Sequence, residues 1–207
     1  MGRWIQVLST ALVVGVAAVS VSFAGVPNPS LSTVPNVVIS PDGSLDYVVT
    51  VVGDEGPIDS ALVQLVFSTE AAGLICWCIG QTEPLIQGTT GPSGEVTFLI
   101  AGGGCLDPDS VITLPAVEVF ANATKLKEVG VVSVDAVDEL QRLPTQGWNP
   151  GGFCTSGLSD GVFHTPPLKL GAYSFCSDIN SDLAVTLADA LLLTPGLKLG
   201  SVCTQAP

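Results

Sequence analysis

The stretch of this 207-residue chain best suited to chemistry runs from Asp178 to Gly200. Oxygen-bearing side chains stand at positions 1, 3, 5, 9 and 12 of a segment that begins at Asp178. A single loop that wraps round a hard cation needs its oxygen ligands at this spacing. The segment therefore predicts a cation site. Its candidate side-chain ligands are Asp178, Asn180, Asp182, Thr186 and Asp189.

The apolar half of this stretch is the second copy of an internal repeat. Residues 158–171 align with residues 187–200 at an offset of 29, and eight of the fourteen positions are identical. We expect one short helix per copy, opened by Ser or Asp and ended before Thr-Pro, because the residue before a proline avoids the helical region. Neither helix can bury an apolar face alone, so the two should pack on each other.

The second copy with its loop resembles the duplicated calcium-binding repeat of dockerin domains. That family's pattern is D-x-N-x-D-x-x-V-x-x-x-D followed by an apolar helix. The matching residues are Asp178, Asn180, Asp182, Val185 and Asp189. The resemblance implies an EF-hand-like Ca²⁺ loop, completed by the backbone carbonyl of Ala184 and by Thr186, either directly or through water.

The loop departs from the family pattern at position 6, where Leu183 replaces the usual Gly, and it has Ser181 at position 4. A non-Gly residue held in the left-handed conformation costs roughly 1 kcal/mol or more. Two alternatives follow. The loop is a working cation site, or it is a vestige stabilised by Asx-type turns.

The first copy keeps less of the pattern. Counting back from Asp160 as position 12 places Cys154 at position 6 and no acid at positions 1, 3 or 5. Asp135 and Asp138 could contribute if residues 143–153 are an insertion looped out of the site. The alternative is that a disulfide-stapled loop has replaced the ion.

In dockerin domains the partner surface lies on the duplicated helices. The resemblance therefore implies a cohesin-like module as partner. Residue by residue it maps the contact surface onto Ser159, Gly161, Val162, Ala188, Ala190 and Leu191.

The chain between Gly25 and about Val134 reads as a β-domain. Short runs rich in Val, Ile, Phe and Thr recur between turn signals, a spacing typical of an antiparallel sandwich. In the run from Glu95 to Ala101, Val96, Phe98 and Ile100 should face inward. The expected strands are 34–39, 46–52, 61–68, 74–79, 95–101, 117–121 and 129–134.

This half resembles bacterial immunoglobulin-like domains of the invasin/intimin type. The resemblance rests on Gly56-Pro57-Ile58 before the 63–67 run, and on residues 88–98, which look like the turn and inward-alternating strand of those modules. It implies a mainly β, immunoglobulin-like antiparallel β-sandwich with an adhesive or spacer role and no active site. A small α-helical dockerin-like unit would follow it.

The N-terminal segment and the net charge limit the possible cellular location and the possible binding partners of the protein. Arg3, an apolar run over 5–23, and Ser22 and Ala24 before Gly25 predict a cleaved signal peptide, with a membrane anchor as the alternative. We expect a protein that is secreted or at the cell surface, with no stable membrane insertion after cleavage. The net charge of −13 argues against nucleic acid as a partner and is compatible with binding a divalent cation.

Six cysteines in a secreted chain predict disulfides. They are Cys76, Cys78, Cys105, Cys154, Cys176 and Cys203. Three precede the boundary near Val134 and three follow it, so at least one bridge joins the halves if all six pair. Cys76 and Cys78 should face one side of a strand, and one of them should pair with Cys105. A free thiol in each half is the alternative.

Catalysis has little support in the sequence. Ser156, Asp160 and His164 are spaced i, i+4, i+8, but His164 stands where the other copy has Leu193, so an interface histidine is expected. Trp77 and Trp148 could stack on a sugar, although packing is the commoner role of tryptophan.

The predicted organisation is a signal peptide (1–24), an immunoglobulin-like β-sandwich (25–134) and a dockerin-like repeat (135–207). The predicted function is non-enzymatic: the repeat docks to a partner or caps the sandwich, with or without Ca²⁺. A purely structural surface or matrix protein and a carbohydrate-binding module are the alternatives.

Overall fold

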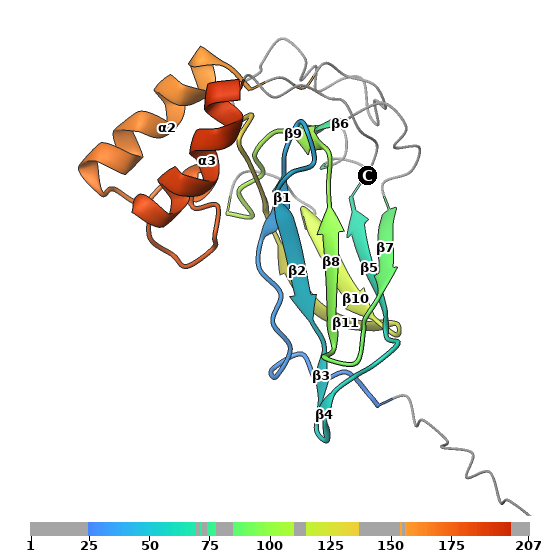
Figure 1. Cartoon of the computed structure of the whole chain (residues 1–207). Helices are drawn as coiled ribbons and strands as arrows, with labels where there is room; N and C mark the ends of the chain where they lie inside the picture. The colour runs from blue at the N-terminus through green and yellow to red at the C-terminus, as the bar shows by residue number, and fades with distance from the viewer. Residues whose placement is uncertain are drawn as a thin grey trace, which may run out of the picture.

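The computed structural model describes residues 25–68, 71, 74–77, 85–109, 115–136, 154 and 156–199. These residues form a mainly β protein whose two α-helices come last in the chain (Figure 1). None of the described helices is long and apolar enough to cross a membrane. The expected signal segment, residues 1–24, lies outside the described residues.

The largest sheet has four antiparallel strands in the order β11-β10-β5-β7. Their bounds are Leu62–Phe67 for β5, Leu85–Thr89 for β7, Val117–Ala121 for β10 and Thr124–Val129 for β11. Antiparallel strands β2 and β8 lie across from this sheet (Figure 1). They run over Asp46–Thr50 and Glu95–Leu99.

Shorter pairs complete the strands. β1 pairs with β12 in parallel, so the first strand of the described chain lies beside the last strand before the helices. Their bounds are Val37–Ile39 and Val131–Ser133. The other two pairs are β3 (Val52–Gly53) with β4 (Gly56–Pro57) and β6 (Cys76–Trp77) with β9 (Gly102–Gly103).

The core lies between the sheets because side chains alternate along the strands. In β8 the predicted alternation is confirmed: Val96 and Phe98 are buried and their neighbours are exposed, and Ile100 beyond the strand is buried. The Trp77 ring is buried edge-on against Phe67, with centroids 4.9 Å apart. Trp77 is therefore a packing residue, and the alternative prediction, that its ring stacks on a sugar, is wrong. Trp148 lies outside the described residues.

Strands β7 and β11 were not among the expected strands. In β7 the signal is hidden by Gly88, where an added Cβ would lie 2.9 Å from the Val96 side chain, so close packing on β8 demands glycine. In β11 charged residues mask the pattern, since only Leu126 and Val129 of its side chains are buried. Charged side chains are typical of edge strands, which they protect from further pairing.

The single strand expected over 129–134 is instead divided at Gly130. β11 ends before this glycine, and β12 begins after it and pairs with β1 in place of β10. A Cβ at Gly130 would overlap the Phe175 ring and the carbonyl oxygen of Leu106. The change of sheet therefore depends on a glycine that lets the chain pass close to the helical region.

The two repeat copies form helices over equivalent residues. Helix α2 spans Leu158–Leu170 and α3 spans Leu187–Leu199, an offset of 29 at both ends, with the 3-10 helix η1 (Phe175–Ser177) between them. The two helices contact each other, as the repeat predicted.

The prediction that the helices open at Ser or Asp and end before Thr-Pro is wrong. Both helices continue through their prolines. The hydroxyl of Thr165 donates to the carbonyl of Gly161, and that of Thr194 to the carbonyl of Ala190, each at 2.5 Å. Beyond the prolines, Leu168 and Leu197 pack against the core. This tertiary burial offsets the helix-breaking cost of an interior proline, which is about 3 kcal/mol.

Among the described residues, two disulfides join the strands to the helical region: Cys76–Cys154 and Cys105–Cys176. The prediction that at least one bridge crosses between the halves is confirmed. The predicted bridge from Cys105 to Cys76 or Cys78 is wrong, as is a free thiol at any of the four bonded positions. Cys78 and Cys203 lie outside the described residues.

The course of the chain after β9 explains this pairing. Gly104 takes a φ of 116°, and Leu106 then forms a bridge with Val131 of β12. β12 contacts η1, which holds Cys176, so Cys105 arrives beside that cysteine. The strands and helices also share one apolar core, because Ile179 and Leu193 belong to the same buried cluster as the inward-facing strand residues.

His164 lies at the junction of α2 and the strands, as an interface histidine was expected to. Its ring is buried, with Nε2 3.2 Å from the carbonyl oxygen of Val134 and Nδ1 3.0 Å from the hydroxyl of Ser177. A carbonyl can only accept, so Nε2–H donates to Val134 and Nδ1 accepts from Ser177. Burial lowers the pKa of His164, because the charged ring would lose its hydration.

We predict that His164 makes the protein less stable as pH falls below about 6.5. The unfolded chain binds the proton more tightly than the folded one, so this contribution is complete above an unfolded pKa of roughly 6.5 and is lost as pH falls below it. The loss approaches about 1.4 kcal/mol per pH unit. His164→Gln, which cannot titrate, should remove this slope in urea unfolding curves. An identical slope in the variant would contradict the assignment.

Candidate functional site

The predicted cation loop lies between η1 and α3. It brings together three of its predicted ligands: one carboxylate oxygen from each of Asp178, Asp182 and Asp189 lies within 4.8 Å of the others. Asp178 and Asp189 are buried, and Asp182 is exposed. The Asn180 amide joins the cluster by donating to Asp182 at 2.9 Å. The three carboxylates form a set of hard oxygen ligands suited to Ca²⁺.

The loop's own backbone N–H groups orient these carboxylates. Asp178 accepts from Asp182 at 3.1 Å and from Leu183 at 3.0 Å, one bond to each carboxylate oxygen. The N–H of Ala184 donates to Asp182 at 3.0 Å. The acids are therefore held in a compact arrangement within the loop.

Asp189 ties the loop to the first turn of α3. Its Oδ1 accepts from the N–H of Ile179 at 2.9 Å, and its Oδ2 accepts from the N–H of Thr186 at 2.8 Å. The Thr186 hydroxyl, the predicted ligand at position 9, lies 3.4 Å from the same Oδ2. This buried carboxylate thus closes the loop and caps the helix at once.

The loop backbone is left-handed at its fourth and sixth positions. Leu183 has a φ of 66° and Ser181 a φ of 58°. The Leu183 side chain is 78% exposed, so little burial offsets a cost of about 1–2 kcal/mol for the left-handed conformation. The loop holds its shape despite the missing glycine.

The loop shifts the pKa of one of its carboxyls, that of Asp178. The pKa of Asp178 is raised first by burial and then by the charges of Asp189 and Asp182, against the lowering effect of its two backbone hydrogen bonds. The pKa of Tyr173, which borders the loop, is also raised, by burial and then by Asp178, Asp107 and Asp109. A bound cation would relieve this concentration of negative charge.

The six predicted partner-contact residues lie on α2 and α3. Ser159, Val162, Ala188 and Leu191 are exposed, and Gly161 and Ala190 are half-buried. Val162 and Leu191 occupy equivalent repeat positions and are 64% and 66% exposed. The structure therefore places the predicted contact residues at the surface of the helix pair.

Sequence reasoning missed two further exposed pairs on the same helices. Leu158 and Leu187 are equivalent, as are Phe163 and Leu192, and all four side chains are exposed. The repeat offset of 29 could have revealed them, because it shows which apolar positions recur in both copies. We call these four residues, with Val162 and Leu191, the duplicated apolar face.

The residues with triad-like spacing do not form a nucleophile and base. The partners of the His164 ring are Ser177 and Val134, so it holds the junction together and has no bond to Ser156. Asp160 instead accepts the N–H of Gly157 at 2.8 Å at the start of α2. His164 therefore packs at the junction, and Asp160 caps the start of α2.

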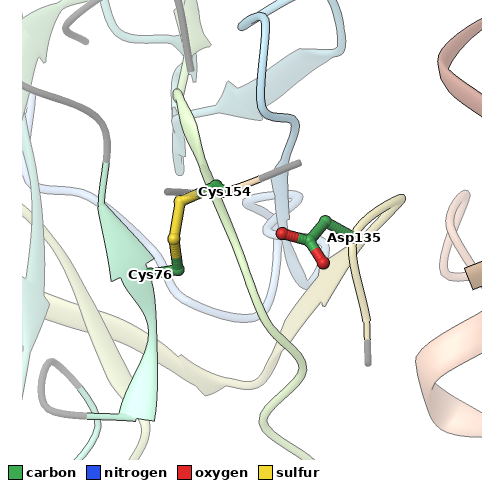
Figure 2. Close-up of side chains that lie close together, drawn as sticks. All are labelled: Cys76, Asp135 and Cys154. Atoms are coloured by element: carbon green, nitrogen blue, oxygen red, sulfur yellow. A yellow bond between two sulfur atoms is a disulfide. The ribbon is translucent and has the colours of Figure 1, made fainter. Parts of the chain in front are cut away.

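A second group with potential ligand atoms lies at the first copy: Cys76, Asp135 and Cys154, all buried (Figure 2). The two sulfur atoms are bonded to each other, so neither is a thiolate available to a metal.

No family model, no curated protein and no solved structure matches this chain.

We predict that Leu183→Gly stabilises the protein by about 0.5–1 kcal/mol, because it removes the left-handed strain and costs only part of that in unfolded-state entropy. Urea unfolding measures the change. Leu191→Gly is the matched control, since this leucine is also apolar and exposed but lies inside a helix, where glycine costs about 0.5–1 kcal/mol. Equal destabilisation by both changes would contradict the strain at Leu183.

Proposed function

We propose that this chain is an extracellular, non-enzymatic binding protein. An immunoglobulin-like sandwich carries a dockerin-like helix pair, which docks to a cohesin-like module through the duplicated apolar face. Ca²⁺ bound at the 178–189 loop orders the start of α3.

The observation that carries the proposal is the equivalence of exposed residues in the two copies. Leu158 and Leu187 are 85% and 74% exposed. His164 and Leu193, another pair of equivalent positions on the same helices, are fully buried. Large apolar side chains gathered on one surface mark an interaction site more often than isolated ones do. Because these side chains recur at the repeat offset, we favour a partner that contacts both helices at once.

The charge of the chain favours a different protein over a second copy as the occupant. Each chain carries a net charge of −13, so two copies repel each other. A separate module with a complementary apolar patch avoids that cost. The cohesin-like identity of the module comes from the dockerin resemblance.

Features of the strands support the immunoglobulin-like half. The antiparallel four-stranded sheet lies across from the β2–β8 pair (Figure 1), and side chains of both belong to one buried cluster. The first and last strands, β1 and β12, lie side by side in parallel. In the proposed arrangement these strands serve as a rigid base for the helix pair.

The cation has a defined place in this arrangement. Asp189 belongs both to the acidic cluster and to the first turn of α3. An ion held by the cluster would therefore stabilise the start of the helix that presents Leu187, Leu191 and Leu192. Loss of the ion should weaken docking through this helix more than through α2.

We predict that Ca²⁺ raises the melting temperature relative to chelated protein. At a hundredfold excess over the dissociation constant, binding adds about 2.7 kcal/mol, or roughly 5–10 °C for a chain of this size. Asp182→Asn removes one ligand charge at an exposed position and should abolish most of the shift. Asp46→Asn, an exposed acid on β2, is the matched control and should keep it. Identical melts with and without chelator would sink the cation part of the proposal.

We predict that Val162→Asp and Leu191→Asp each weaken docking to a purified cohesin-like module from the same source by roughly 10–100-fold, the value of one buried aliphatic side chain. Calorimetry measures the dissociation constant. Leu99→Asp, which changes an exposed leucine on β8, should leave it unaltered.

Three results would contradict the docking proposal. Unchanged affinity in both helix variants would exclude this face as the contact. Absence of binding to any such module by the wild type would favour the purely structural function, in which the helix pair caps the sandwich. Equal loss in Leu99→Asp would show that the effect comes from added charge.

A further inference from the structure

We infer that the first copy is the remnant of a second cation loop, with Asp135 at its first position, and that the Cys76–Cys154 disulfide now closes this loop in place of an ion. Counting back from Asp160 along the sequence finds no acid at positions 1, 3 and 5 of this first loop. The equivalence of the two loops is shown by backbone hydrogen bonds that both copies make.

The carboxylates of Asp160 and Asp189 have matching partners. In the second copy Asp189 accepts from Thr186 at 2.8 Å and from Ile179 at 2.9 Å. In the first copy Asp160 accepts from Gly157 at 2.8 Å and from Ala136 at 2.9 Å. Gly157 is the repeat equivalent of Thr186, so Ala136 takes the place of Ile179.

The spacing explains why the match is hidden in the sequence. Ala136 and Ile179 are 43 positions apart, which is 14 more than the repeat offset of 29. The first loop therefore contains 14 extra residues between Ala136 and Cys154. A count that assumes equal loop lengths misses its first position.

The residues around Ala136 extend the equivalence. Asp135 precedes Ala136 as Asp178 precedes Ile179, and both aspartates are 1% exposed. Their preceding residues, Val134 and Ser177, bond the two nitrogens of the same His164 ring. Asp135 is thus the counterpart of Asp178, the first ligand of the candidate cation loop.

The two equivalent aspartates have different neighbours. Around Asp178, within 4.8 Å between ligand atoms, are the carboxylates of Asp182 and Asp189. Around Asp135, within the same distance and among the described residues, are the sulfur atoms of Cys76 and Cys154 (Figure 2). Cys154 stands at loop position 6, where the second copy has Leu183. A covalent bond to β6 therefore lies where the second copy gathers its acids.

Two clamps of different chemistry follow from this arrangement. The disulfide closes the first loop at all Ca²⁺ concentrations, and the acidic cluster closes the second loop with an ion. The ionic half rests on the proposed function, and the covalent half does not. The chain should bind one Ca²⁺, and the start of α2 should not respond to chelation.

Calcium stoichiometry and amide hydrogen exchange test this on the full chain after signal removal. Equilibrium dialysis should give one Ca²⁺ per chain. Chelation should speed exchange of the Ile179 and Thr186 amides about tenfold and leave the Ala136 and Gly157 amides unchanged. The double variant Cys76→Ser/Cys154→Ser should speed exchange of Ala136 and Gly157 about tenfold even in Ca²⁺. The matched variant Cys105→Ser/Cys176→Ser should leave those two amides unchanged.

The outcomes separate this inference from the proposed function. Two Ca²⁺ per wild-type chain, or faster exchange of the Ala136 amide on chelation to the same extent as that of Ile179, would overturn the inference. Both readings use the wild type, so they hold even if the cysteine variants fail to fold. Unaltered Ala136 and Gly157 exchange in a folded Cys76→Ser/Cys154→Ser variant would also overturn it. Absence of Ca²⁺ binding with the cysteine result as expected would refute only the ionic half.

Discussion

Covalent attachment between strands and helices is the constraint on which the rest of this structure depends. The bridges Cys76–Cys154 and Cys105–Cys176 join residues 78 and 71 positions apart. Closing loops of this length removes unfolded-state entropy worth about 4 kcal/mol per bridge in the chain-entropy model. The bridges hold the helix pair against the strands, where Ile179 and Leu193 enter the common core. The helices therefore keep one face buried and present the duplicated apolar face outward.

Buried aspartates carry out the same structural task in both copies. Asp160 and Asp189 each satisfy a backbone N–H at the start of a helix and another in the preceding loop. A buried carboxylate is tolerated because these donors replace its lost hydration. Each helix start is thereby tied to the loop before it. A change in either loop, by an ion or by a disulfide, is passed directly to the helix that follows.

Much of the fold could be predicted from local pattern. The alternation of Val96, Phe98 and Ile100 predicted an inward-facing strand correctly, since period-two burial is a property of the strand itself. The prediction failed where contacts with another part of the fold determine the local structure. Strand β7 contains Gly88 because β8 packs closely against it, and α2 passes through Pro166 and Pro167 because its later residue Leu168 reaches the core. Neither neighbour can be identified from the local sequence.

The sequence by itself determined the duplication and the spacing of acids over 178–189, because both depend only on the order of residues along the chain. It also determined that at least one disulfide crosses between the halves if every cysteine pairs, which is a matter of parity. Only the tertiary structure decided which cysteines pair and that Asp135 corresponds to Asp178. Those relations join residues separated by different numbers of intervening positions. Packing of β12, η1 and the two helices brings them together, and no spacing rule records that packing.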